Sequence, residues 1–342
     1  MKKYVMSLMA AAMLATPAVA QMSEAETKLY EAAKSEGELS WYVAQFTTGV
    51  AEDFAANFTS IYPGVKVNVI RATGQVVYSR LSQDLRNRVA QADVFSGSDQ
   101  THLVELKENG NLLQFTPENA TKLRKPYLNL QPDGYWYTSS ANPTVMAYNT
   151  NHISAADAPT NWTDLIDPKW KGKVALSHPG FSGSTGSWAV MMRRLYGDEF
   201  FTKLEANDPL IGRSLSDPPS TLIAGERSIG IGTLGTVTRH KLAGNPIEII
   251  YPTDGAKLTL SGTAIPANAP HPNAAQLFVN YLLSEQGSAR MVAAGLQPLR
   301  PEVAPPEGTK ALDEILTDNP SLEELIEGVQ PVIELWRNVF GA

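Results

Sequence analysis

A run of small hydroxyl-bearing residues directly before a helix-forming segment has the clearest chemical potential in this sequence. Residues 182–187 read Ser-Gly-Ser-Thr-Gly-Ser, and residues 188–195 favour a helix. The first turn of a helix carries unpaired N–H groups and the positive end of the helix dipole, so it attracts anions. An ordinary capped helix on the surface is the alternative. The residues predicted to bind an anion here are Ser182, Gly183, Ser184, Thr185 and Gly186.

Hydroxyl-bearing turns also follow the predicted strands in the first half of the chain. Strands over 39–44, 65–70 and 92–95 alternate with helices over 50–62 and 76–90. This β-α-β-α-β pattern predicts a parallel sheet, and ligands of such sheets bind beyond the carboxyl ends of the strands. Helix capping alone would also place hydroxyls there. The strand-end residues that we expect on the opposite wall of the site are Thr47, Thr48, Thr73, Gly74 and Ser98.

Other residues near predicted strand ends extend this hypothetical site. Arg71 ends the second predicted strand among small residues, and its planar guanidinium could pair with an anionic ligand. A surface arginine is the alternative. A glycine-rich turn follows a strand predicted over 228–231, and another strand is predicted over 248–252. We expect the remaining ligand contacts to come from Thr233, Gly235 and Tyr251.

The same glycine-rich turn fits a dinucleotide-binding fingerprint. Gly230–Gly235 matches G-x-G-x-x-G, and Asp254 follows at about the spacing of a ribose contact. An NAD-dependent oxidoreductase is therefore an alternative from another class, although this motif normally opens its domain. Neither G-x-S-x-G nor H-E-x-x-H occurs in the sequence. We predict no catalytic residue, no cofactor and no metal site.

The first twenty residues have the features of a secretory signal peptide. Lys2 and Lys3 precede an apolar segment, and Ala18-Val19-Ala20 is an A-x-A cleavage site. The apolar segment is too short and too rich in alanine to favour a membrane span. We expect cleavage after Ala20 and a soluble protein in the periplasm.

Composition narrows the classes of partner. Without Lys2 and Lys3 the chain has 26 basic and 35 acidic side chains, a net charge of −9. This charge argues against nucleic acid and anionic membrane surfaces as partners. The sequence contains no cysteine, so disulfides and thiolate chemistry are excluded. The 322 residues after the cleavage site are enough for two domains.

The second half of the chain continues the α/β pattern without a low-complexity linker. Strands are expected over 134–138, 143–150 and 174–177, and an extended segment over 258–265 crosses back. Because strands join the two halves, we expect hinge closure rather than free domain motion. The expected organisation is a signal peptide over 1–20, one lobe over 21–142 with about 260–300, and a second lobe over 143–259 with about 301–342.

Several segments resemble the extracellular solute-binding proteins of ABC importers. The most specific is Asp167–Lys173, Asp-Pro-Lys-Trp-Lys-Gly-Lys, and the likeness covers essentially the whole mature chain. Within this family, the chain is similar to the branch that includes ferric-ion, phosphorylated-sugar and phosphonate binders. The other similar segments are residues 43–48, 62–67, 92–95, 162–165 and 269–275.

The resemblance implies a two-lobed fold of the type II, cluster D-like class, with two crossing strands and a cleft between the lobes. It also implies delivery of a small ligand to an ABC permease in the inner membrane, without catalysis. Ferric binders of this branch use two adjacent tyrosines in the turn that here reads Gly232-Thr233-Leu234-Gly235-Thr236, so a ferric ion is the less favoured alternative. We expect a monomer that closes on a small organic anion carrying phosphate, phosphonate or carboxylate.

Overall fold

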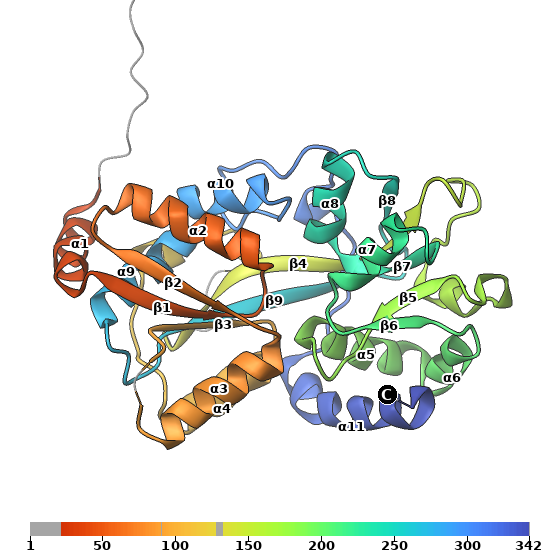
Figure 1. Ribbon diagram of the computed structural model, residues 1–342, viewed down its shortest axis with the longest axis horizontal. Helices are drawn as coiled ribbons and strands as arrows, with labels where there is room; N and C mark the ends of the chain where they lie inside the picture. The colour runs from red at the N-terminus through yellow and green to blue at the C-terminus, as the bar shows by residue number, and fades with distance from the viewer. Residues whose placement is uncertain (1–21, 90, 128–132, 342) are drawn as a thin grey trace, which may run out of the picture.

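The computed structural model describes residues 22–89, 91–127 and 133–341, which form two α/β lobes joined by long strands (Figure 1). The predicted signal peptide lies outside the described residues. Within those residues the strands form one sheet in the order β2-β1-β3-β9-β4-β7-β5-β6, and β8 pairs with β4. The strands are β1 (Glu38–Val43), β2 (Lys66–Arg71), β3 (Val94–Gly97), β4 (Trp136–Asn149), β5 (Val174–Ser177), β6 (Leu210–Gly212), β7 (Ile229–Thr233), β8 (Ile247–Ile250) and β9 (Lys257–Ala264).

The first lobe is built on three parallel strands, as the alternating sequence pattern predicts. Trp41 on β1 lies opposite Val69 on β2 and Val94 on β3. Helices cover the sheet, so Trp41 is fully buried and packs edge-to-face on Phe278, with 4.9 Å between ring centroids. The helices of this lobe are α1 (Glu24–Glu36), α2 (Thr48–Ile61), α3 (Gly74–Arg86), α4 (Gln100–Glu108), α9 (Pro272–Leu282) and α10 (Glu285–Ala293).

The second lobe packs large aromatic side chains around β5 and β7. Trp162, Trp188 and Trp336 are fully buried, and the first two meet edge-to-face with 5.6 Å between ring centroids. The last helix lies along α5 and α6 (Figure 1). Among the helices of the described ranges, none is both long and apolar enough to cross a membrane. The helices of this lobe are α5 (Gly183–Tyr196), α6 (Glu199–Glu205), α7 (Asp217–Ile223), α8 (Leu234–Leu242) and α11 (Leu322–Phe340).

Short 3-10 helices occupy several of the connections between these elements. Asn161 caps one of them, and its side chain accepts a hydrogen bond from the Asp164 N–H. The adjoining 3-10 turn is capped by Asp167, whose side chain accepts a hydrogen bond from the Lys169 N–H. These caps fix the connection that leads into β5. The 3-10 helices are Glu118–Lys122, Lys125–Tyr127, Trp162–Ile166, Pro168–Trp170 and Leu312–Glu314.

Two long antiparallel strands cross from one lobe to the other. β4 pairs with β9 from Trp136 opposite Ala264 to Thr144 opposite Lys257. The expectation of two separate strands over 134–138 and 143–150 was wrong, because the polar residues between them stay inside the sheet: the Ser139 hydroxyl, for example, is buried and hydrogen-bonded to Thr263. The expected lobe boundary between residues 142 and 143 falls within β4, and the lobe limits stay a prediction.

The lobes touch each other beside the crossing strands. Gly183, the first residue of α5, lies against Asp99, the N-cap of α4. A Cβ atom on Gly183 would be only 2.7 Å from the Asp99 backbone nitrogen. Helix α11 also contacts α4. The structure is therefore a closed arrangement of the two lobes.

Candidate functional site

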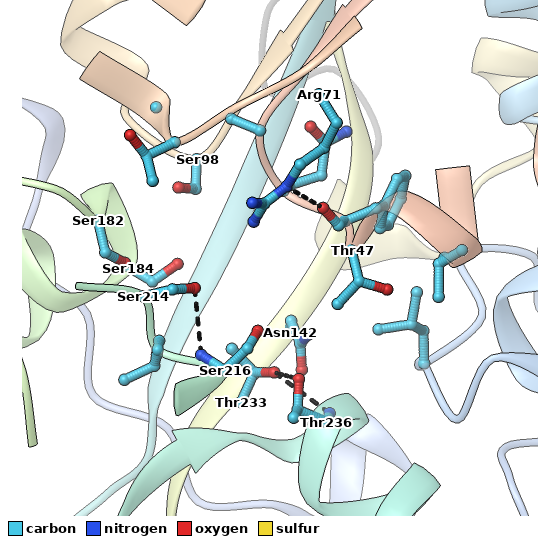
Figure 2. Close-up of a pocket in the computed structure, with 18 of the residues that line it drawn as sticks. Thr47, Arg71, Ser98, Asn142, Ser182, Ser184, Ser214, Ser216, Thr233 and Thr236 are labelled. Atoms are coloured by element: carbon cyan, nitrogen blue, oxygen red, sulfur yellow. Dashed lines mark hydrogen bonds between the residues drawn. The ribbon is translucent and has the colours of Figure 1, made fainter. Parts of the chain in front are cut away.

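A cavity that is partly open to solvent lies between the lobes (Figure 2). Both lobes line the cavity, so a ligand inside it would contact both at once. The residues predicted from the sequence that the structure brings to this cavity are Thr47, Arg71, Thr73, Gly74, Ser98, Ser182, Ser184 and Thr233.

Four helices direct their N-terminal ends at the cavity. The N-cap residues of α2, α3, α5 and α8 are Thr47, Thr73, Ser182 and Thr233, and all four line it. The side chains of Thr47 and Thr73 make no capping hydrogen bond, so their hydroxyls are available to a ligand. Unpaired N–H groups and positive dipole ends from both lobes therefore converge on one space. This arrangement favours an anion.

Two arginines add positive charge to the cavity wall. The Arg71 Nε–H donates to the Phe46 carbonyl oxygen at 3.0 Å, which orients the guanidinium toward the centre of the cavity (Figure 2). Arg239 lines the opposite side from α8, where burial lowers the pKa of its guanidinium. Arginine nevertheless remains charged in proteins. The two lobes thus each supply one guanidinium, and a guanidinium suits a phosphate or carboxylate group.

The charge balance of the lining is one-sided. Among the described residues that line the cavity, none is an aspartate, glutamate, histidine or tyrosine. Elsewhere in the described part of the chain, no group of three or more such acidic or histidine side chains gathers around a common point. The cavity therefore presents two cations and many hydroxyls without a counter-charge, which is the donor set of an anion site.

Two amide side chains near the crossing strands supply further polar contacts. The Asn142 Oδ1 accepts a hydrogen bond from the Gly235 N–H at 3.1 Å, which leaves the Asn142 NH₂ group as a donor toward the cavity. The Gln45 Oε1 is buried and has no hydrogen-bond partner in the described protein. A buried acceptor of this kind is costly unless a ligand or water donates to it.

Three of the predicted residues on α5 do not line the cavity. The helix begins at Gly183, so successive side chains point in different directions rather than all toward the ligand. Thr185 is fully buried within the second lobe, where its hydroxyl bonds to Ser177. Gly186 faces the Pro179 carbonyl oxygen. Gly183 packs against Asp99 beside the cavity.

Three other predicted residues also lie away from the cavity. Thr48 is exposed in the first turn of α2. Gly235 packs under Leu296 and acts on the site only through its bond to Asn142. The Tyr251 hydroxyl accepts a hydrogen bond from the Lys310 N–H at 3.1 Å, and burial raises the pKa of this tyrosine.

The structure adds residues that the sequence analysis did not assign to the site. Thr236 and Arg239 follow Thr233 at intervals of three, so they share its face of α8 and line the cavity with it. Ser214 and Ser216 follow β6, a three-residue strand that the sequence pattern does not reveal. The residues missed in all are Ala44, Gln45, Phe46, Val50, Asn142, Phe181, Ser214, Leu215, Ser216, Thr236, Arg239 and Leu296.

The glycine motif at Gly230–Gly235 serves packing rather than dinucleotide binding. A Cβ atom on Gly230 would lie 2.6 Å from the Ala175 carbonyl oxygen on the neighbouring strand. Asp254, the expected ribose contact, accepts hydrogen bonds from the Trp162 N–H at 2.9 Å and from the Tyr196 hydroxyl. Its carboxylate therefore anchors parts of the second lobe to each other.

Gly230→Ala is expected to destabilise the fold by about 1–3 kcal/mol, because the new methyl group would clash with the backbone of β5. Chemical denaturation measures this change. Gly49→Ala on α2 is the matched control, since nothing lies within 4 Å of its added Cβ. Equal free energies of unfolding for the two variants would contradict the packing role of Gly230.

The fold and the site together define a two-lobed binding protein that closes over a small ligand. Residues 90–321 match the family of bacterial extracellular solute-binding proteins. The chain belongs to this family, as a periplasmic solute-binding protein of the kind that serves ABC importers. A relative from Salmonella typhimurium, named a candidate 2-aminoethylphosphonate-binding periplasmic protein, is 26% identical over 89% of each chain.

Solved structures show the same type II, two-lobed fold. The periplasmic binding protein AfuA of Actinobacillus pleuropneumoniae, with exogenous fructose-6-phosphate bound, has a TM-score of 0.80 and 23% identity over 89% of this chain and 99% of its own. Iron-bound HitA of Pseudomonas aeruginosa has a TM-score of 0.76 and 22% identity, over 88% of this chain and 99% of its own. The predicted fold class and family are confirmed.

Proposed function

We propose that this protein captures a small organic anion with a phosphate ester or phosphonate group, held between the lobes as they close. The observation that carries the proposal is the convergence of four helix N-termini and two arginines on a cavity whose described lining has no carboxylate. A doubly charged phosphate offers more acceptor oxygens to these donors than a carboxylate does. Carboxylates are therefore expected to bind less tightly.

Three of the ligand classes named for the relatives can be compared with the lining of the cavity. Iron, the ligand of HitA, needs anionic oxygen or imidazole ligands, which the described lining does not supply. The ammonium group of 2-aminoethylphosphonate would find no carboxylate partner there. A sugar phosphate, as in the AfuA complex, carries hydroxyls that can exchange hydrogen bonds with the serine and threonine side chains lining the cavity. A ligand whose remaining part is uncharged and carries hydroxyl groups therefore fits the cavity best.

The sequence and the relatives support the following proposal for the cellular setting. We propose that the chain is exported, that its signal peptide is removed after Ala20, and that the mature monomer carries its ligand to an ABC permease in the inner membrane. Binding requires the ligand to favour the closed lobes over the open ones, and no covalent step. This proposal makes the protein a carrier rather than an enzyme.

A thermal-melting screen of the mature chain tests the ligand class. Fructose 6-phosphate, 2-aminoethylphosphonate, citrate, ferric ion and NAD are added at equal concentration. We expect fructose 6-phosphate to give the largest rise in melting temperature, about 5 °C at a hundredfold excess over its Kd. A larger rise with ferric ion, together with a colour that a chelator removes, would establish the iron alternative. A selective rise with NAD would show dinucleotide binding and favour the oxidoreductase alternative.

A further inference from the structure

A lysine lies buried between the lobes, at the second-lobe end of the crossing strand β9. The side chain of Lys257 is only 5% exposed. Its ammonium group donates one hydrogen bond, to the Leu258 carbonyl oxygen at 2.8 Å. Among the described residues, none forms an ion pair with it. A buried ammonium group without an ion pair is costly in its charged form.

The surroundings of this ammonium group come from both lobes. Lys257 lines a small second cavity, with Asp99 on the first-lobe side and Gly183 and Ser187 of α5 on the other. Ser98 lines both this cavity and the main one, so the two are neighbours. The second cavity therefore exists only while the lobes are together.

The charged groups around Lys257 offset little of the free-energy cost of burying its ammonium group. On α4, Asp99 attracts the ammonium group, but its carboxylate already accepts hydrogen bonds from the Thr101 N–H and hydroxyl and lies 3.6 Å from His102. Glu324 of α11 does not line the second cavity, and its carboxylate lies 3.5 Å from the Arg194 guanidinium.

The other elements packed around Lys257 present uncharged side chains. Gly183 and Ser187 are the wall residues of α5, Leu325 and Val329 are those of α11, and Thr144 is opposite on β4. Among the described residues that line this cavity, Asp99 is thus the one charged side chain that attracts the Lys257 ammonium group, and the other lining side chains are uncharged.

We propose that Lys257 couples closure of the lobes to the release of a proton, so that ligand capture strengthens as the pH rises. Opening separates Asp99 and the helix α5 from each other and admits water to the lysine, where the charged form is stable. Closing removes that water, and the neutral amine becomes the favoured form. This inference rests on the lobe closure of the proposed function, but not on the identity of the ligand.

The direction of the pH dependence follows from the two states of the lysine. Burial lowers the pKa of Lys257 to about 7 in the closed structure, whereas a solvated lysine titrates near about 10.4. Between these values the closed state binds fewer protons than the open state, so closure gains stability with rising pH. A phosphate monoester is already doubly ionised above about pH 7 and adds little change of its own. We expect affinity to rise about twentyfold from about pH 7.5 to about pH 9.

Isothermal titration with fructose 6-phosphate at several pH values tests this coupling. The wild-type chain is compared with Lys257→Met, which keeps the length of the side chain without the charge, and with Lys66→Met on the exposed edge of β2 as the matched control. Lys257→Met should bind with nearly pH-independent affinity and release no proton, measured as equal binding heats in buffers of different ionisation enthalpy. Lys66→Met should behave like the wild type. Equal pH slopes for Lys257→Met and the wild type would overturn the proposal.

Small-angle X-ray scattering without ligand separates this inference from the proposed function. We expect the radius of gyration of the wild type to fall between about pH 7 and about pH 9.5, and that of Lys257→Met to be small at both values. If fructose 6-phosphate does not bind at any pH, the proposed ligand class fails, while this scattering difference still supports the coupling. Radii that change with neither pH nor substitution would overturn it. Thermal melting establishes that each variant is folded.

Discussion

Arg71→Gln is expected to weaken binding of a phosphate ester about 100-fold, because the variant loses a guanidinium that points into the cavity. Removal of a charged donor also leaves the ligand's own charge less well compensated inside a partly enclosed space. Because Arg71 holds only the Phe46 carbonyl oxygen in the described protein, the free energy of unfolding should change little. Isothermal titration with fructose 6-phosphate and chemical denaturation measure the two effects.

Two further variants make this result specific. Arg213→Gln removes an exposed guanidinium that lies over Phe181, 4.7 Å from its ring centre, outside the cavity lining. It is expected to bind almost as the wild type does. Arg71→Lys keeps the charge but loses the planar fork, so its affinity should fall between those of the wild type and Arg71→Gln. Equal losses for Arg71→Gln and Arg213→Gln would show a general effect of charge rather than a ligand contact.

The architecture could be predicted from the sequence because each strand, helix and helix end is marked by residues close together in the chain. The alternation of apolar strands with amphipathic helices identifies the parallel sheet of the first lobe, and Gly37 marks the end of α1 with a left-handed φ of 79°. The hydroxyl residues at strand ends were also visible, since Ser and Thr favour N-cap positions. Because four of these caps, two from each lobe, line the same cavity, the core of the site followed from recognising caps.

The remainder of the site depends on three-dimensional placement that the sequence does not display. Asn142 lies in the middle of a strand, and only the crossing of β4 between the lobes brings it to the cavity. Arg239 stands two turns into α8, and it reaches the cavity because that helix points its first turns inward. Thr185 has the same residue type as the cap threonines, yet the rotation of α5 turns it into the core.

Gly183→Ala is expected to lower ligand affinity about tenfold or more strongly, with a lower limit near fivefold, by holding the lobes apart, while leaving the open protein as stable as before. In the closed structure the added Cβ would lie 2.7 Å from the Asp99 nitrogen and 3.0 Å from its Cα, and these backbone atoms cannot yield as a flexible side chain can. Overpacking of this kind costs about 1–3 kcal/mol, and about 1.4 kcal/mol corresponds to a tenfold change in affinity. In the open form the methyl group meets only water, and alanine is a better helix residue than glycine.

Because Gly183 does not line the main cavity, a loss of affinity in Gly183→Ala would come from impaired closure of the lobes and not from a lost contact with the ligand. Titration with fructose 6-phosphate should show the loss of affinity, and scattering with saturating ligand should show a larger radius of gyration than for the wild type. Gly49→Ala makes the same substitution in the first turn of another helix, where nothing lies within 4 Å of the new atom, and should change neither quantity. Wild-type affinity in Gly183→Ala would mean that the lobes do not close onto Asp99 when the ligand is bound. The closed arrangement described above would then not be the form of the protein that holds the ligand.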